Sequence, residues 1–184
     1  NHDQKLVLLV VGDVFGIEWN GKMPRPMMNI INGGRHADND ISVQEFMIVP
    51  SADSFAEQIH IAVRIYHALH DLLNEQDFGT GLGDEGGFAP KLHRNEQALQ
   101  LILQAIDRTG YRKGIDVSIA LDVAASEFAK GPNYNFEDKQ LSARELIDVY
   151  QEWHDHYPII SIEDGLGEDD WANWQELTLS LIHI

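Results

Sequence analysis

Short apolar segments rich in β-branched residues alternate with amphipathic segments, and this alternation restricts the chain to the α/β class. Val117–Leu121 and Ile159–Ile162 are predicted strands, and each follows a segment whose apolar residues have helical spacing. Near-continuous apolar strands between helices are typical of a parallel sheet that helices cover on both faces. The sequence therefore predicts an α/β domain built on a parallel sheet.

Three segments have the apolar spacing of amphipathic helices: 54–76, 95–109 and 142–155. Asn95 is the expected N-cap of the second helix, and Ser142 with Glu145 forms the capping-box pattern at the start of the third. A further helix is expected to begin near Asp169 or Asp170.

Two apolar segments near the start, Met27–Ile31 and Phe46–Val49, are also predicted strands. The predicted order is then β, β, α, α, β, α, β, α, with a Gly-rich loop between the first two helices and a small excursion at Tyr134–Phe136 before the third. The chain contains no internal repeat and no low-complexity stretch, and no linker divides residues 23–178. We therefore expect one domain over this range.

Charge and cysteine content exclude several functional classes. The 184 residues hold 13 Lys and Arg against 30 Asp and Glu, a net charge of −17, so nucleic acids and anionic membrane surfaces are disfavoured partners and divalent cations are favoured ones. The absence of cysteine excludes disulfides, thiolate metal sites and cysteine nucleophiles. The longest apolar run, Leu6–Val11, is too short to span a bilayer and is interpreted as a buried strand or a stray terminal segment.

Carboxylates stand directly at the ends of the two best-defined strands. Asp122 follows Val117–Leu121, and Glu163 follows Ile159–Ile162. Active sites of parallel α/β folds lie at the carboxyl ends of the strands, and Mg²⁺ prefers oxygen ligands, one or two of them carboxylates. An acidic residue after a single strand is more often a helix N-cap, but the pair in equivalent positions favours a metal site.

Two glycine-rich segments carry further candidates. Glu85 lies within Gly83–Gly87 and could act as a general acid or base, although a solvated turn explains the same composition equally well. In the segment 32–39, Arg35 and His36 could meet an anion, although a loop histidine is more often without a function. Glu45 begins the next strand and could face the same edge of the sheet. The motifs G-x-S-x-G, H-E-x-x-H and the P-loop are absent.

Five long blocks, read together and in order, resemble the enolase family over residues 23–178. The residues that carry the resemblance are Met23–Gly34 with His36–Asn39, Gln44–Met47, Gly83–Pro90, Leu121–Phe128 and Ser161–Leu166. Residues 1–22 and 179–184 do not match the family's pattern. The resemblance implies the first half of a modified (β/α)₈ barrel that begins β-β-α-α, without the family's N-terminal domain and last barrel units.

The resemblance also implies a reaction and roles for particular residues. Enolases are Mg²⁺-dependent lyases that reversibly dehydrate 2-phosphoglycerate to phosphoenolpyruvate in glycolysis and gluconeogenesis. Asp122 and Glu163 would be two of three carboxylate ligands of the metal. Glu85 would help the hydroxide leave as general acid with Glu45 beside it, and His36 would lie in a closing loop near the substrate. The full-length family is commonly homodimeric and cytoplasmic.

The family's third metal-binding Asp and its proton-abstracting Lys fall beyond the matching segment, so we expect the 184-residue chain to be inactive alone. The sequence also allows two alternatives: a non-catalytic Mg²⁺-binding or surface-binding remnant, and a truncated gene model without independent function. A different acid-sugar enzyme of the wider superfamily is disfavoured by the blocks Asn32–Asn39 and Gly83–Pro90.

Overall fold

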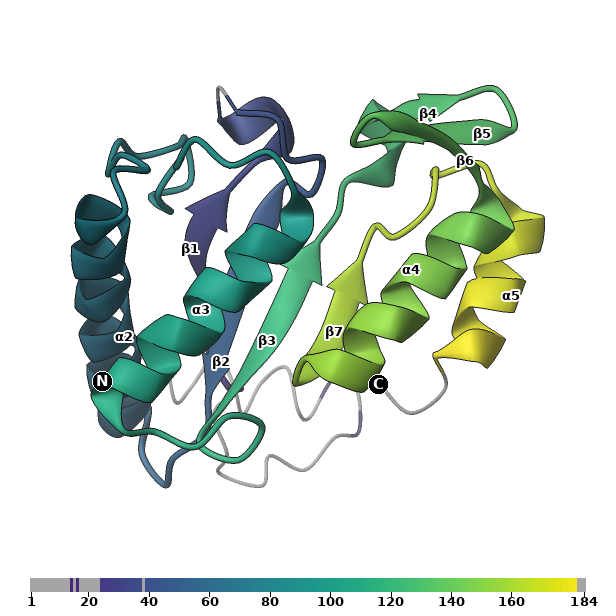
Figure 1. Ribbon diagram of the computed structural model, residues 1–184. Coiled ribbons are helices and arrows are strands. Elements are labelled where there is room, and N and C mark those ends of the chain that lie inside the picture. Colours follow the sequence, from purple (N-terminus) through teal and green to yellow (C-terminus); the bar gives the residue numbers. More distant parts are fainter. Residues whose placement is uncertain (1–13, 15, 17–23, 38, 182–184) are drawn as a thin grey trace.

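The computed structural model describes residues 14, 16, 24–37 and 39–181, so the segment Leu6–Val11 lies outside the described residues. A four-stranded sheet has the order β1-β2-β3-β7, and a small three-stranded sheet has the order β4-β5-β6 (Figure 1). The elements are β1 (Met28–Asn32), the 3-10 helix η1 (Gly34–His36), β2 (Glu45–Pro50), α2 (Phe55–Glu75), α3 (Asn95–Thr109), β3 (Val117–Asp122), the 3-10 helix η2 (Ala125–Glu127), β4 (Ala129–Lys130), β5 (Asn133–Phe136), β6 (Lys139–Ser142), α4 (Ala143–His156), β7 (Ile159–Glu163) and α5 (Trp171–Ser180).

The expected β-β-α-α opening and the positions of the helices are confirmed, but the expectation of a parallel sheet is wrong for two of the three strand pairs. β1 pairs with β2 and β2 pairs with β3 in antiparallel fashion, and only β3 and β7 are parallel. The reason lies in the connections. The two helices α2 and α3 run in opposite directions between β2 and β3, so the chain returns to the end of the sheet that it left.

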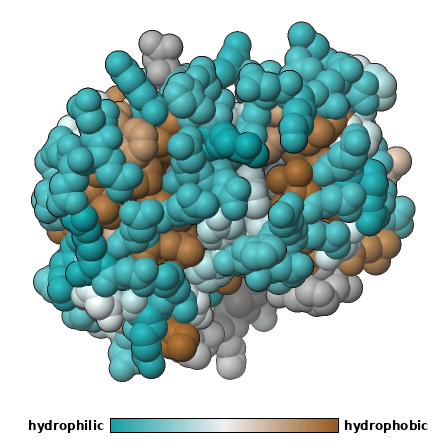
Figure 2. Space-filling model, in the orientation of Figure 1, coloured by the Kyte–Doolittle hydropathy of each residue, from teal (hydrophilic) through white to brown (hydrophobic). Residues whose placement is uncertain are grey.

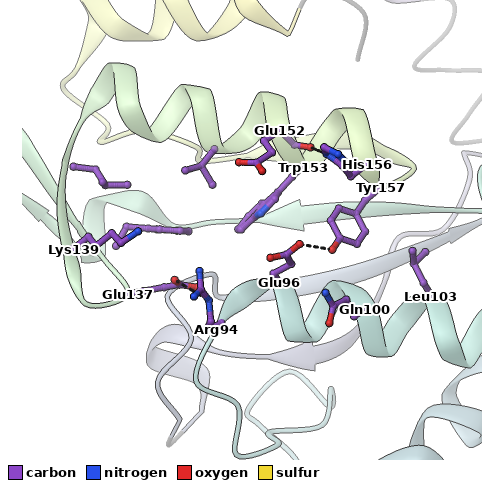
Figure 3. Close-up of a pocket in the computed structure, with 13 residues that line it drawn as sticks. Arg94, Glu96, Gln100, Leu103, Glu137, Lys139, Glu152, Trp153, His156 and Tyr157 are labelled. Carbon is purple, nitrogen blue, oxygen red and sulfur yellow. Dashed lines mark hydrogen bonds and ion pairs between the residues drawn. The ribbon is translucent and has the colours of Figure 1, made fainter.

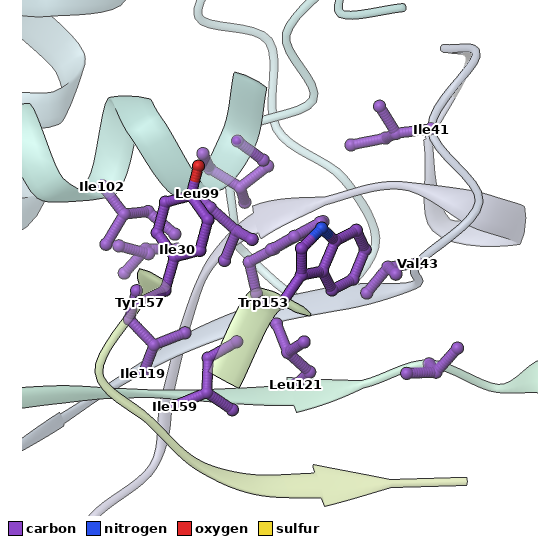
Figure 4. Close-up of a cluster of buried hydrophobic side chains, with 14 of the residues drawn as sticks. Ile30, Ile41, Val43, Leu99, Ile102, Ile119, Leu121, Trp153, Tyr157 and Ile159 are labelled. Carbon is purple, nitrogen blue, oxygen red and sulfur yellow. The ribbon is translucent and has the colours of Figure 1, made fainter. Parts of the chain in front are cut away.

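The helices cover one face of the sheet, whereas the expected parallel sheet would have been covered on both. Alternate strand residues point to opposite faces, and Phe46, Ile119 and Leu121 belong to the main core together with helix residues. Figure 4 shows Ile119 and Leu121 in this cluster with Leu99 and Ile102 of α3. Met47 and Ala120, on the other face, belong to a separate small cluster that contains no residue of the described helices. Each fully buried Ile or Leu of the main core stabilises the fold by roughly 1.5–3 kcal/mol.

The start of α4 is capped by residues close in the sequence, whereas the start of α3 also depends on contacts with distant residues. The capping box of α4 is confirmed, because the Glu145 backbone N–H donates to Ser142 Oγ at 3.3 Å and Glu145 Oε2 accepts from the Ser142 N–H at 2.8 Å. The prediction that Asn95 caps α3 is wrong: Arg94 is the N-cap residue, and Asn95 is the first helical residue. The Asn95 side chain is instead used by the distant backbone N–H of Val43 at 2.9 Å.

Candidate active site

Four polar residues form one row across the main sheet, which we call the polar row: Asn32, Glu45, Asp122 and Glu163. In the strand register Asn32 is the partner of Glu45, Glu45 of Asp122, and Asp122 of Glu163. Residues paired across neighbouring strands point to the same face. The row lies at the end of the sheet where β3 and β7 finish, with η1 and the loop between α2 and α3 at the same end (Figure 1).

Strand direction explains why these residues meet. Asp122 and Glu163 end parallel strands, whereas Glu45 begins the antiparallel β2 and therefore reaches the same end of the sheet. Asn32 is fully buried, Glu45 and Asp122 are half-buried, and Glu163 is exposed. Carboxylates on three adjacent strands concentrate negative charge at this end of the sheet, and a nearby cation favours their charged forms. The polar row is thus electrostatically suited to a cation.

The ends of β3 and β7 are joined by backbone hydrogen bonds and turn sharply. The Val123 N–H donates to the Glu163 carbonyl and the Ala125 N–H to the Asp164 carbonyl, both at 2.9 Å. Ala124 and Asp164 have φ of 49° and 48°, a left-handed conformation that residues other than glycine adopt at a cost. These bonds hold the backbone of the two carboxylate-bearing strand ends in a defined relation.

The donor set suits a hard cation but is incomplete for one. Among residues 24–37 and 39–181, no three His, Asp or Glu side chains are close enough together to hold a metal ion. Mg²⁺ is usually bound by one or two carboxylates, with water and substrate oxygens completing its shell. Asp122 and Glu163 are register partners and therefore fit the two-carboxylate part of such a site.

The loop that carries Glu85 is bound to the outer side of β1. The Asn32 N–H donates to the Phe88 carbonyl at 2.8 Å, and the Phe88 N–H donates to the Ile30 carbonyl at 2.9 Å. A tight turn closes by the bond from Gly83 N–H to the Gly87 carbonyl at 2.8 Å, with Glu85 exposed within it. Glu85 thus lies beyond β1, at the same end of the sheet as the polar row.

Three asparagines around this loop were not predicted as part of the site. A Cβ on Gly87 would lie 2.6 Å from Asn32 Oδ1 and 3.0 Å from Asn29 Oδ1, so only glycine allows this close approach. Asn29 Nδ2 and Oδ1, Asn32 Oδ1 and Asn39 Oδ1 are buried without a hydrogen-bond partner among the described residues. An asparagine within the otherwise apolar segment Met27–Ile31 was the sequence signal that could have found Asn29.

The loop with Arg35 and His36 is folded back on itself between β1 and β2. The Gly33 N–H donates to the Gln44 carbonyl and the Gly34 N–H to the Ile41 carbonyl, each at 2.9 Å. Arg35 forms an exposed ion pair with Glu127 just after β3, at 2.9 Å. The backbone of His36 is therefore held at the end of the sheet that carries the polar row. An anion bound by Arg35, as expected from the sequence, would have to compete with the Glu127 carboxylate.

A cavity lies elsewhere in the described part of the chain. It has a volume of about 510 Å³ and is enclosed by α3, α4 and the β5–β6 hairpin, with Arg94, Glu137 and Tyr157 in its wall (Figure 3). None of the five site residues predicted from the sequence lines it. Glu137 in this wall also bonds to the loop that precedes Glu45, through Ser42.

Comparisons with known proteins agree on one family. The family model described as enolase, C-terminal TIM barrel domain, matches residues 20–183. The enolase of Natranaerobius thermophilus is 48% identical over 168 residues, which are 90% of this chain and 39% of that protein. The chain thus spans about two fifths of the length of this relative. In the part of the chain that the structure describes, no helix is long and apolar enough to cross a membrane.

Proposed function

Since the chain belongs to the family of enolase C-terminal TIM barrel domains, we propose that its residues serve the reversible dehydration of 2-phosphoglycerate to phosphoenolpyruvate. The observation that carries this proposal is the polar row, which sets Glu45, Asp122 and Glu163 side by side on adjacent strands. The loops of His36 and Glu85 at the same end of the sheet support it. The four strands would form the first half of the family's barrel.

Asp122 and Glu163 would hold Mg²⁺, with the remaining ligands supplied by substrate, by water and by a carboxylate outside this chain. When bound, the ion offsets negative charge that develops on the substrate carboxylate as the neighbouring proton leaves. The half-buried Asp122 accepts a hydrogen bond from the Ala124 N–H at 3.2 Å, which orients its carboxylate. The exposed Glu163 remains accessible to an arriving ion.

Glu85 would protonate the departing hydroxide, and His36 would lie near the substrate phosphate. A positioned general acid typically contributes a factor of about 10²–10⁴ to the rate. Glu45, which pairs with Asp122 across the strands, would lie beside the reacting end of the substrate. The base that removes the proton would come from a part of the enzyme outside this chain, so we propose that the 184 residues do not turn over alone.

A chimera tests the proposal most directly. Residues 24–178 would replace the matching segment of the Natranaerobius thermophilus enolase, and phosphoenolpyruvate formation would be followed by absorbance. We expect an active chimera, and we expect Glu85→Gln to lower its kcat by about 10²-fold or more. The control is Asp84→Asn, which removes an adjacent exposed carboxylate from the same loop.

Four results would contradict the proposal. An inactive but folded chimera that still binds Mg²⁺ would favour a non-catalytic remnant, and an unfolded chimera would favour a chain without a function of its own. Equal effects of Glu85→Gln and Asp84→Asn would remove Glu85 from its role. Phosphoenolpyruvate formation by the 184-residue chain alone would show that the base need not come from outside it.

A further inference from the structure

Glu137 takes part in a closed ring of hydrogen bonds that joins three distant segments. The Val43 N–H donates to Asn95 Oδ1 at 2.9 Å, and Asn95 Nδ2 donates to Glu137 Oε1 at 3.0 Å. The Glu137 N–H in turn donates to Ser42 Oγ at 2.8 Å, and Ser42 is adjacent to Val43. The ring therefore ties the β5–β6 turn, the first residue of α3 and the loop before β2 to one another.

The ring is shielded from water, and its carboxylate is well satisfied. Asn95 and Val43 are fully buried, and 17% of the Glu137 side chain is exposed. Glu137 Oε1 also accepts the Asn95 backbone N–H at 2.8 Å, so it caps the first residue of α3, while Gln97 Oε1 accepts the Arg94 N–H at 3.1 Å. A carboxylate that is largely removed from water destabilises the fold unless hydrogen bonds compensate for the lost solvation. The ring is thus a specific contact and not a solvated turn.

The backbone conformation at Glu137 also indicates that its side chain is required. Glu137 has φ of 53° in the turn between β5 and β6. Short hairpin turns with positive φ favour Asn and Gly, which adopt this conformation at little cost. A glutamate here is disfavoured by the turn itself, so its carboxylate contacts with Asn95 must offset that cost.

The ring acts on the segment that leads into the candidate active site. Ser42 and Val43 end the loop that contains His36, and Gln44 connects them to Glu45, the first residue of β2. The loop closes on the same short segment, through the bond from the Gly33 N–H to the Gln44 carbonyl. Any displacement of Val43 would therefore be transmitted to both Glu45 and the His36 loop.

We propose that Glu137 is a positioning residue that holds the His36 loop and Glu45 in place through Asn95. The β5–β6 hairpin is then an anchor for the polar row, although none of its own residues belongs to that row. This inference rests on the proposed enolase function only for its catalytic consequence, because the mechanical link itself is independent of the reaction.

The experiment uses four variants and two readouts. In the 184-residue chain, hydrogen exchange of the Val43 and Glu45 amides is measured by NMR. In the chimera, kcat and KM are measured. Glu137→Ala removes the carboxylate, Glu137→Gly removes it while relieving the positive φ, Glu137→Gln keeps an acceptor for Asn95, and Asp138→Ala alters an exposed neighbour in the same turn.

We expect Glu137→Ala and Glu137→Gly to accelerate exchange of the Val43 amide by about tenfold, because Asn95, which accepts from this amide, loses both of its hydrogen bonds to the carboxylate. In the chimera, kcat should fall by a similar factor with KM little changed, and Glu137→Gln should restore most of the loss. Asp138→Ala should match the wild type in both readouts.

A folded Glu137→Gly variant with wild-type amide exchange would overturn the link. Accelerated exchange with unchanged kcat in an active chimera would overturn the positioning role. If Glu137→Ala does not fold, Glu137→Gly decides both points. If the wild-type chimera is itself inactive, the proposed function has failed, and exchange at Glu45 in the 184-residue chain alone decides whether Glu137 holds β2.

Discussion

Asp122 and Glu163 are register partners on the parallel strands β3 and β7, and each is followed within two residues by a left-handed backbone turn. These turns direct the chain away from the sheet immediately after each carboxylate. The two side chains therefore remain at the very end of the sheet, where parallel α/β folds bind ligands. Their partner Glu45 extends the same line onto the antiparallel β2.

This relationship predicts that Mg²⁺ binding depends on the pair. Asp122→Asn or Glu163→Gln should weaken Mg²⁺ binding by at least about tenfold. Mutation of a residue that only orients a metal ligand typically causes a loss of this size, and loss of a ligand itself should cost no less. Isothermal titration of Mg²⁺ into the 184-residue chain measures the affinity. Asp53→Asn is the matched control, because it removes an exposed carboxylate beyond the opposite end of β2. Equal affinities for all variants would remove the pair from the metal site.

Gly87 should be intolerant of any side chain, whereas Gly81 in the same loop should accept one. A Cβ at Gly87 would lie 2.6 Å from Asn32 Oδ1 and 3.1 Å from the Ile30 backbone carbon, while nothing lies within 4 Å at Gly81. Gly87→Ala should lower the free energy of unfolding by about 1–3 kcal/mol. Urea unfolding compares it with Gly81→Ala, and similar stabilities would contradict the packing described here.

Tyr150 should contribute a buried hydrogen bond to the turn after Glu163. Its hydroxyl donates to the Gly165 carbonyl at 2.9 Å, and burial raises the pKa of Tyr150 well above its ordinary value, which keeps the donor protonated. Tyr150→Phe should lower the free energy of unfolding by about 1–3 kcal/mol, because the carbonyl is left unsatisfied. The control is Tyr111→Phe. The Tyr111 hydroxyl accepts an exposed hydrogen bond from Arg64, so its removal should lower the free energy of unfolding far less than Tyr150→Phe does, as measured by urea unfolding.

Asp116 should make stability depend on pH in the acid range. Hydrogen bonds from the Arg112 side chain and backbone lower the pKa of Asp116 from 3.8 to about 2. A carboxyl with a lower pKa in the folded state stabilises the fold above about pH 4, and this contribution is lost as the pH falls toward 2. Asp116→Asn should therefore be less stable than the wild type at about pH 6, with the difference shrinking by about pH 2.5 in urea unfolding. A difference that does not vary with pH would contradict the ion pair.

Local patterns were sufficient for the helices and for one of their caps. The apolar spacing over residues 142–155 predicted α4 within one residue at each end, and Ser142 with Glu145 forms the predicted capping box. Both depend on residues only a few positions apart, so neither needs information about the rest of the chain. The same reasoning placed Asp122 and Glu163 at the ends of their strands.

Local patterns do not predict a side chain that bonds to a distant partner. Asn95 has the composition of an N-cap, yet its side chain is used by Val43, which is 52 residues away, and by Glu137, which is 42 residues away. Local patterns also do not predict that β2 is antiparallel to β3. This direction arises because α2 and α3 together bring the chain back to the end of the sheet where β2 finishes, and β3 begins there.

The amino-acid sequence by itself determined which segments form the α-helices and the four strands of the main sheet, and which of these strands carry carboxylates at their ends, since periodicity and capping are properties of neighbouring residues. Only the tertiary structure decided that Asn32, Glu45, Asp122 and Glu163 share one row, and that Glu137 is bound to the loop before β2. These relations depend on strand register and on hydrogen bonds between residues far apart along the chain. Such contacts form only when the whole core packs, so no local pattern encodes them.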